Sequence, residues 1–185
     1  MKSITVLLFF LSTVVSAQKG ADININSIQN IESTDYVVTF TSNHSKVGFQ
    51  EFSNNKLIFV NTKTNQTKIV EIPSKTNIRQ ITSTIESKYK NSNFIVVECY
   101  SMAEKVLPKA STTIYELYLV ELNTFQLIKI STDNFTLKDW VVKGENDTLA
   151  IVEEENGVKN DFVKTNSISV INLKSGEKST VFSAN

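Results

Sequence analysis

The sequence predicts an all-β protein that is built from three repeats of a four-stranded antiparallel unit. A twelve-residue pattern begins at Lys56, Glu116 and Ser167: an apolar run is followed by Asn or Glu, and then by a short turn that carries Thr or Ser and then Gln or Glu. The copies lie roughly 60 and roughly 50 residues apart, at the long end of the spacings that indicate tandem arrays. Short apolar runs without polar alternation fill much of the remaining chain and favour strands that are covered on both faces.

Residues 1–17 have the pattern of a secretory signal peptide. Lys2 supplies a short basic region, residues 4–15 are mostly apolar, and Val15-Ser16-Ala17 is a small-residue cleavage site. The apolar run is shorter than the about 20 residues that span a bilayer, and an N-terminal membrane anchor is the alternative. We therefore expect a chain that starts at Gln18, is secreted or periplasmic, and has no stable membrane insertion after the signal is removed.

The composition of the chain places residues 18–185 among ordinary globular domains. Hydrophobic residues make up 41% and charged residues 21%, so one domain with a real core is expected. The 19 basic and 19 acidic residues balance, which gives no electrostatic case for binding nucleic acid or an anionic membrane.

Cys99 is the only cysteine, which excludes an intrachain disulfide and favours a bacterial periplasm or surface for an exported chain. We expect it to be a buried strand residue, with a reactive thiol or an intermolecular disulfide as the alternative.

Each repeat contains four expected strands, which we name A, B, C and D in chain order. The three units are expected at residues 24–72, 78–131 and 135–184. The expected strands are 25–31, 36–40, 57–60 and 69–72 in unit one, 78–85, 94–100, 115–120 and 127–130 in unit two, and 137–142, 149–152, 168–171 and 180–182 in unit three. Ile78, Ile81 and Ile85 have helical spacing, but the Thr and Ser content of residues 76–88 favours a strand there.

Tandem four-stranded antiparallel meanders are the unit of a β-propeller. The chain resembles the blades of secreted propeller proteins of the WD-repeat and TolB-like general type, and the resemblance covers almost all of residues 18–185. The Trp-Asp dipeptide of the WD family is absent, since Asp139-Trp140 has the reverse order, and the usual glycine of the C–D turn occurs only as Gly176. The resemblance implies an architecture and no catalytic residues. Propellers close with about 4 to 8 blades, so three propeller-like blades would belong to a larger ring, be completed by a second chain or form an open arc; a two-sheet β-sandwich is the alternative fold.

The sequence contains no pattern that is typical of an active site. His44 is the only histidine and is expected to be an exposed residue in the loop after strand B of unit one. One histidine and one cysteine do not supply the ligands of a zinc site, and neither a Gly-x-Ser-x-Gly motif nor a glycine-rich phosphate loop is present. We therefore expect no catalytic residue, no metal and no cofactor, and favour a non-enzymatic protein.

The densest acidic cluster is formed by residues 153–155 and Asp161, around the Asn156-Gly157 dipeptide. Clustered carboxylates can bind Ca²⁺, but the spacing does not match an EF-hand loop. Consecutive residues of a strand also point to opposite faces of the sheet. Because Asn-Gly is a strong turn signal, we interpret the cluster as a solvated hairpin end.

The connections between strands B and C carry the functional prediction. Residues 41–56, 101–113 and 153–166 are longer than a hairpin needs, and long loops on a rigid scaffold often bind ligands. In propellers these connections share one rim with the D–A connections. The candidate binding residues are His44, Phe49, Phe52, Met102, Glu104, Lys105, Glu154, Glu155 and Asp161. The sequence therefore predicts a secreted binding or interaction module for a protein or small ligand that can also self-associate; the alternative is a partial propeller that belongs to a larger enzyme or sensor assembly.

Overall fold

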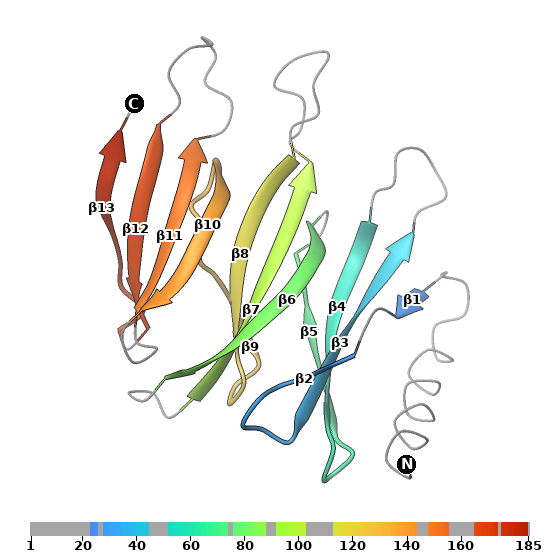
Figure 1. The fold of residues 1–185 in the computed structure, drawn as a ribbon. Helices are drawn as coiled ribbons and strands as arrows, with labels where there is room; N and C mark the ends of the chain where they lie inside the picture. The colour runs from blue at the N-terminus through green and yellow to red at the C-terminus, as the bar shows by residue number, and fades with distance from the viewer. Residues whose placement is uncertain are drawn as a thin grey trace. The chain divides into compact units, whose positions relative to one another are not determined.

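The computed structural model describes residues 23–25, 28–44, 52–73, 76–87, 92–102, 113–143, 148–155, 165–173 and 175–184. The strands of this part of the chain are β1 (Ile23–Ile25), β2 (Gln29–Asn30), β3 (Tyr36–His44), β4 (Phe52–Asn61), β5 (Thr67–Glu71), β6 (Thr76–Ser87), β7 (Ser92–Met102), β8 (Thr113–Glu121), β9 (Gln126–Lys129), β10 (Phe135–Lys143), β11 (Thr148–Glu155), β12 (Asn166–Asn172) and β13 (Lys178–Ala184) (Figure 1). Within these residues, no helix is long and apolar enough to cross a bilayer.

The strands form three antiparallel meanders, which confirms the predicted all-β class and its three four-stranded sheets. The orders are β3-β4-β5, β6-β7-β8-β9 and β10-β11-β12-β13, and both β1 and β2 pair with the outer edge of β3. Strand A of unit one is thus two short strands, where one continuous strand over residues 25–31 was expected. The described strands form no closed sheet. Residues 76–87 are a strand, as their Thr and Ser content predicted.

The three sheets repeat the same pairing of strands B and C. The equivalent pairs of opposed residues are Tyr36–Asn61, Phe94–Glu121 and Thr148–Asn172. The second member of each pair is the Asn or Glu that ends the apolar run of the sequence pattern. Because side chains alternate between the two faces along a strand, residues at equal distances from these pairs lie on equivalent faces of the three sheets.

The turns between strands C and D explain why the sequence pattern recurs. In each turn the amide of the fifth residue donates to the carbonyl of the first over 2.7–2.8 Å (Asn65 to Asn61, Phe125 to Glu121 and Gly176 to Asn172). The fifth residue has a positive φ of 59°, 57° and 77°, respectively. The hydroxyl of the fourth residue accepts a hydrogen bond from the amide of the sixth (Thr64, Thr124 and Ser175). The Thr or Ser of the pattern therefore closes the turn, and a glycine at the fifth position relieves the strain that an L residue has in this conformation.

The hydrophobic core lies mainly where the apolar runs predicted it. The sequence predicts eight buried residues because they lie in the apolar strand runs: Val37, Leu57, Phe59, Val96, Leu119, Trp140, Ile151 and Val170. Of these, Leu57, Phe59, Val96, Leu119 and Ile151 are at most 1% exposed. Val37, Val170 and Trp140 are only partly buried, which corrects the prediction for these three. Val170 is opposite Ala150, on the face that does not carry Ile151, and Trp140 packs at the margin of the core.

The chain divides between Asn77 and Ile78 into two compact units. In the first, Asn55 is buried in β4, and its side-chain amide donates to the carbonyl of Thr76 over 2.6 Å and to the Asn77 side chain over 3.3 Å. In the second, the β6–β9 and β10–β13 sheets share one core. Its buried members are Phe94, Val96, Leu117, Leu119, Ile130, Leu137, Leu149, Ile151, Ile171 and Leu173. Apolar packing therefore fixes these two sheets against each other.

Candidate functional site

The candidate binding residues from the sequence fall partly on strands. His44 ends β3 and is paired with Phe52 at the start of β4, and Met102 ends β7. His44 is therefore in a strand, where a loop position was expected. Glu154 and Glu155 lie in β11. Phe49, Glu104, Lys105 and Asp161 lie outside the residues that the structure describes.

The acidic cluster is split between two faces of β11, because successive side chains of a strand alternate. Glu154 forms an ion pair with Lys138 over 3.0 Å at the surface. The side chain of Glu153 is completely buried, with an exposure of 0%. The interpretation of this cluster as a solvated hairpin end is thus wrong for Glu153.

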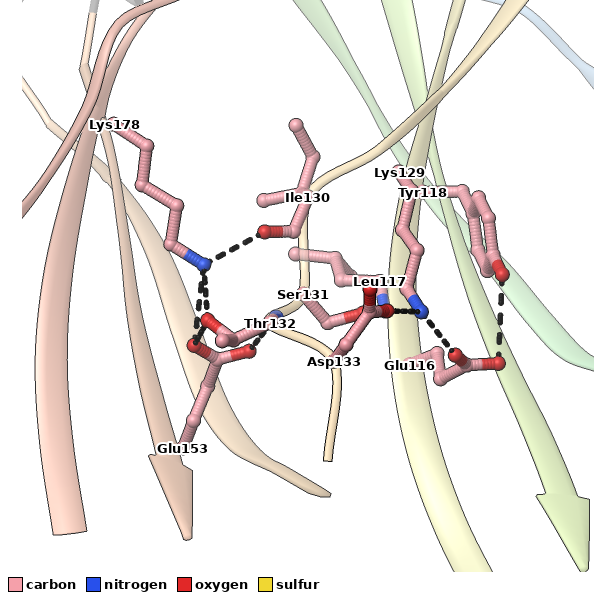
Figure 2. A network of polar contacts seen from close by, with 10 residues as sticks. All are labelled: Glu116, Leu117, Tyr118, Lys129, Ile130, Ser131, Thr132, Asp133, Glu153 and Lys178. Atoms are coloured by element: carbon pink, nitrogen blue, oxygen red, sulfur yellow. Dashed lines mark hydrogen bonds and ion pairs between the residues drawn. The ribbon is translucent and has the colours of Figure 1, made fainter. Parts of the chain in front are cut away.

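Glu153 is held by a set of charge-assisted hydrogen bonds (Figure 2). One carboxylate oxygen accepts from the backbone amide of Thr132 over 2.6 Å, and the other accepts from the Thr132 hydroxyl over 2.6 Å. The ammonium group of Lys178 lies 3.2 Å from the second oxygen. It also donates to the Thr132 hydroxyl over 2.6 Å and to the carbonyl of Ile130 over 2.9 Å. The three protons of the ammonium group therefore all have acceptors.

This geometry gives the Glu153 network a structural role. A completely buried carboxylate whose oxygens already accept hydrogen bonds is not accessible to a substrate. The network instead joins three elements: β13 through Lys178, β11 through Glu153, and the D–A connection between β9 and β10 through Thr132. It therefore holds this connection against the β10–β13 sheet. The same connection is bonded to β8, since the amide of Leu117 donates to the Ser131 hydroxyl over 3.2 Å. Among the described residues, no group of three or more His, Cys, Asp or Glu could hold a metal ion.

A second polar cluster surrounds Lys129 at the end of β9 (Figure 2). Its ammonium group lies 2.8 Å from the Glu116 carboxylate and 2.7 Å from that of Asp133. Although desolvation alone lowers the pKa of Lys129, hydrogen bonds to Asp133 and Glu116 raise it above its ordinary value. The Tyr118 hydroxyl donates to Glu116, and burial first, then the Glu116 charge, raises the pKa of Tyr118. These shifts favour the charged form of Lys129 and the neutral phenol of Tyr118, so neither group is prepared for proton transfer near neutral pH.

Cys99 lies on the same face of β7 as Ile95 and Val97 and is completely buried. Burial raises the pKa of its thiol above the ordinary value of 9.0, and the carboxylates of Glu116 and Glu98 raise it further. A protonated, buried thiol is unreactive, which agrees with the interpretation of Cys99 as a small hydrophobe.

We expect the folded chain to lose stability above pH 9 because of Cys99. From about pH 9 the thiol ionises in the unfolded chain, while it stays protonated in the folded chain. The contribution of this thiol to the free energy of unfolding is therefore complete below the pKa of the unfolded state. Above that pKa the free energy of unfolding falls by about 1.4 kcal/mol per pH unit. The measurement is the free energy of unfolding between pH 8 and pH 10 for the wild type and Cys99→Ala. The slope should be smaller in the variant; equal slopes, or rapid alkylation of the folded wild type at pH 8, would contradict this account.

The third polar cluster contains a half-exposed cation and lies toward the Met102–Thr113 end of the β7–β8 hairpin. Glu98 is buried in β7, and its carboxylate accepts a hydrogen bond from Arg79 Nη1 over 3.2 Å and another from the indole nitrogen of Trp140 over 2.9 Å. The Arg79 guanidinium lies over the ring of Tyr115, 5.2 Å from its centroid. Tyr115 is paired with Tyr100 across the hairpin. Four elements thus contribute to this cluster, which we call the Arg79–Tyr115 surface.

The Arg79–Tyr115 surface is accessible, unlike the Glu153 network. The side chain of Arg79 is 55% exposed and Tyr115 is among the exposed large hydrophobic residues. Cation–π contact and the buried Glu98 carboxylate both restrain the guanidinium. Burial, and then the neighbouring Tyr115, raise the pKa of Tyr100, so its phenol is neutral at neutral pH. The arrangement brings a restrained, half-exposed cation together with two tyrosine side chains.

Sequence reasoning missed Arg79, Glu98, Tyr115 and Trp140 as a group. The available signal was Glu98, a charged residue inside the apolar run of residues 94–100. Such a residue must be paired when it is buried. Its partners, Arg79 and Trp140, are 19 and 42 residues away along the chain, and only the strand register brings them together.

No protein-family model matches the chain, and no curated protein matches it either. The resemblance to WD-repeat and TolB-like blades therefore stays a prediction. The functional argument rests on the residues of the Arg79–Tyr115 surface and their geometry.

Proposed function

We propose that the chain is a secreted, non-enzymatic binding module that recognises a protein partner through the Arg79–Tyr115 surface. The observation that carries this proposal is the restrained, half-exposed guanidinium of Arg79 over the ring of Tyr115. Arg, Tyr and Trp are the residues that contribute most of the free energy at protein interfaces. A guanidinium that is already fixed loses little conformational entropy on binding.

The charge of this surface favours a partner segment that presents a carboxylate. Arg79 forms one ion pair, with Glu98, and one ring contact, with Tyr115, among the described residues. A guanidinium has five N–H donors in a planar fork that matches a carboxylate. The donors that do not bond Glu98 are available to an incoming acidic side chain, and the Tyr115 ring adds apolar area beside them.

The β7–β8 hairpin supports the same location. Strand β9 pairs with β8 as far as the Tyr118–Lys129 pair, whereas β7 and β8 continue to the Met102–Thr113 pair. The hairpin therefore extends past the fourth strand of its sheet, and the Tyr100–Tyr115 pair lies in this extension. This end of the hairpin adjoins the B–C connection of unit two, one of the connections that the sequence prediction singled out.

Photo-crosslinking in the cells that make the protein tests this function. A benzophenone amino acid placed at position 115 should give a discrete crosslinked protein species. The matched control is the same amino acid at Lys68, which is an exposed strand residue of another sheet. A crosslink from both positions indicates a non-specific surface, and no crosslink from position 115 removes the basis of the proposal.

A further inference from the structure

The outer face of the β10–β13 sheet is exposed, and its centre is apolar. Leu149, Ile151 and Ile171 pack into the shared core from the inner face, and successive side chains of a strand alternate between the two faces. On the outer face, Val141 is 49% exposed and Phe182 is 54% exposed. An exposed apolar patch of this kind is typical of an interaction site. The strand register arranges the centre of the face in two rows, Val141-Ala150-Val170-Ser179 and Asp139-Val152-Ile168-Phe182.

The charged residues of this face, within the described part of the sheet, lie on β10 and β11. Lys143 is exposed at one end of β10, and Asp139 is exposed on the other side of Val141. The Lys138–Glu154 ion pair lies beyond Asp139. Because the charges of this pair cancel, Asp139 supplies the net charge of that end. The described outer-face residues of β12 and β13 are uncharged: Asn166, Ile168, Val170, Asn172, Ser179, Phe182 and Ala184.

We propose that the outer face of β10–β13 binds the same face of a second copy of this chain, about a two-fold axis perpendicular to the strands. The contact is isologous, since each copy uses the same surface. Each strand then lies over its own copy and runs in the opposite direction, so the two apolar centres meet. Lys143 of each copy lies over the end of the other face that carries Asp139. The proposal concerns other residues than the Arg79–Tyr115 surface and does not depend on its function.

The distribution of charge selects this axis. Rotation about an axis parallel to the strands would place β10 over the uncharged β13 of the other copy, and both Lys143 and Asp139 would lose water without gaining a partner. Rotation about the perpendicular axis brings opposite charges together at both ends of the contact. Complementary charges at the margin of an interface fix its register. The face is therefore complementary to itself, which favours a second copy as its occupant.

The size of the face predicts a weak dimer. Four strands with about seven residues each give a face of about 19 by 24 Å, or about 460 Å². The contact covers about 900 Å² counting both partners, which lies between the about 800 Å² of most packing contacts and the about 1,200 Å² at which stable interfaces begin. The dimer should therefore dissociate on dilution.

Sedimentation velocity from about 10 to about 500 µM tests this proposal, because interfaces of this size dissociate in such a range. The sample is the chain without its expected signal peptide, and we expect a reversible monomer–dimer equilibrium. Phe182→Lys should weaken the dimer by at least about tenfold, since it places a charge in the apolar centre. Ser183→Lys is the matched control and should leave the equilibrium unchanged, because Ser183 is exposed on the opposite face and is paired with Ser167.

Charge reversal tests the two-fold arrangement. Lys143→Asp and Asp139→Lys should each weaken the dimer by about threefold or more, because like charges then face each other at both ends of the contact. A chain with both changes should recover the wild-type equilibrium. An equimolar mixture of the two single variants should associate more strongly than either alone, since opposite charges face each other again in the mixed dimer. Far-UV circular dichroism confirms that the variants are folded.

A wild type that stays monomeric up to about 500 µM would overturn the proposal and leave another protein as the occupant of this face. A dimer that Phe182→Lys does not weaken would show that the copies meet elsewhere. A dimer that neither charge reversal weakens, or that mixing does not restore, would overturn the perpendicular two-fold axis. These outcomes are independent of the crosslink from position 115, which reports on the Arg79–Tyr115 surface.

Discussion

Lys178→Ala should lower the free energy of unfolding by about 3 kcal/mol, because it leaves the carboxylate of Glu153 buried without its cation. The side chain of Glu153 is 0% exposed, so water cannot replace the ammonium group without opening the core. Thr132 still donates two hydrogen bonds, which keeps the loss below that of a fully isolated charge. Trp140, the only tryptophan, packs against the shared core, and its fluorescence during denaturation by urea reports on this unit.

Lys56→Ala is the matched control for this prediction, and its unfolding is followed by far-UV circular dichroism, because Lys56 is in the first compact unit and Trp140 is in the second. Lys56 and Lys178 have nearly equal side-chain exposures of 29% and 28%, but Glu71, the partner of Lys56, is 75% exposed. An exposed pair contributes at most about 1 kcal/mol, so the two losses should differ by about 2 kcal/mol or more. Equal losses would show that the burial of Glu153 does not determine the strength of its network.

Phe59→Ala should lower the free energy of unfolding by about 3–5 kcal/mol. Phe59 is 0% exposed in β4, an inner strand that lies between β3 and β5 in its sheet. Truncation removes a buried aromatic ring and leaves a cavity that the surrounding strands can fill only in part. Far-UV circular dichroism during denaturation is the measurement, since Phe59 is in the first compact unit and Trp140 is in the second.

Phe135→Ala serves as the control for Phe59, because Phe135 is only half-buried at the start of β10. It should cost clearly less than Phe59→Ala. A loss below about 0.5 kcal/mol for Phe59→Ala would mean that β4 is not an inner, doubly covered strand.

The repeat was predictable because strands and turns are local. The apolar runs contain the information for strands C and D, together with the turns between them, which run from Asn or Glu to Gln or Glu. The same pattern accounts for the positive φ at Asn65, Phe125 and Gly176. The ends of the strands were predicted less accurately. His44 belongs to β3, although the apolar run that predicted this strand ends at Phe40.

The polar clusters were not predictable from spacing because they depend on register. Glu153 and Glu154 are adjacent in sequence, yet one is completely buried and the other pairs with Lys138 at the surface. The alternation of faces was expected, but the face of each residue was not known until the pairing of β10, β11 and β12 was available. Trp140 was expected in the core as an apolar residue; its indole N–H bonds Glu98, which keeps it at the margin.

The yield of the crosslink from position 115 in an Arg79→Ala chain tests the proposed binding function most directly. Loss of an interfacial arginine that carries the affinity costs about 2 kcal/mol or more, so the yield should fall by at least about tenfold. Lys68→Ala, which removes an exposed cation from β5 of the other unit, should leave it unchanged. An Arg79→Ala chain that folds and crosslinks as well as the wild type would contradict recognition through the Arg79–Tyr115 surface.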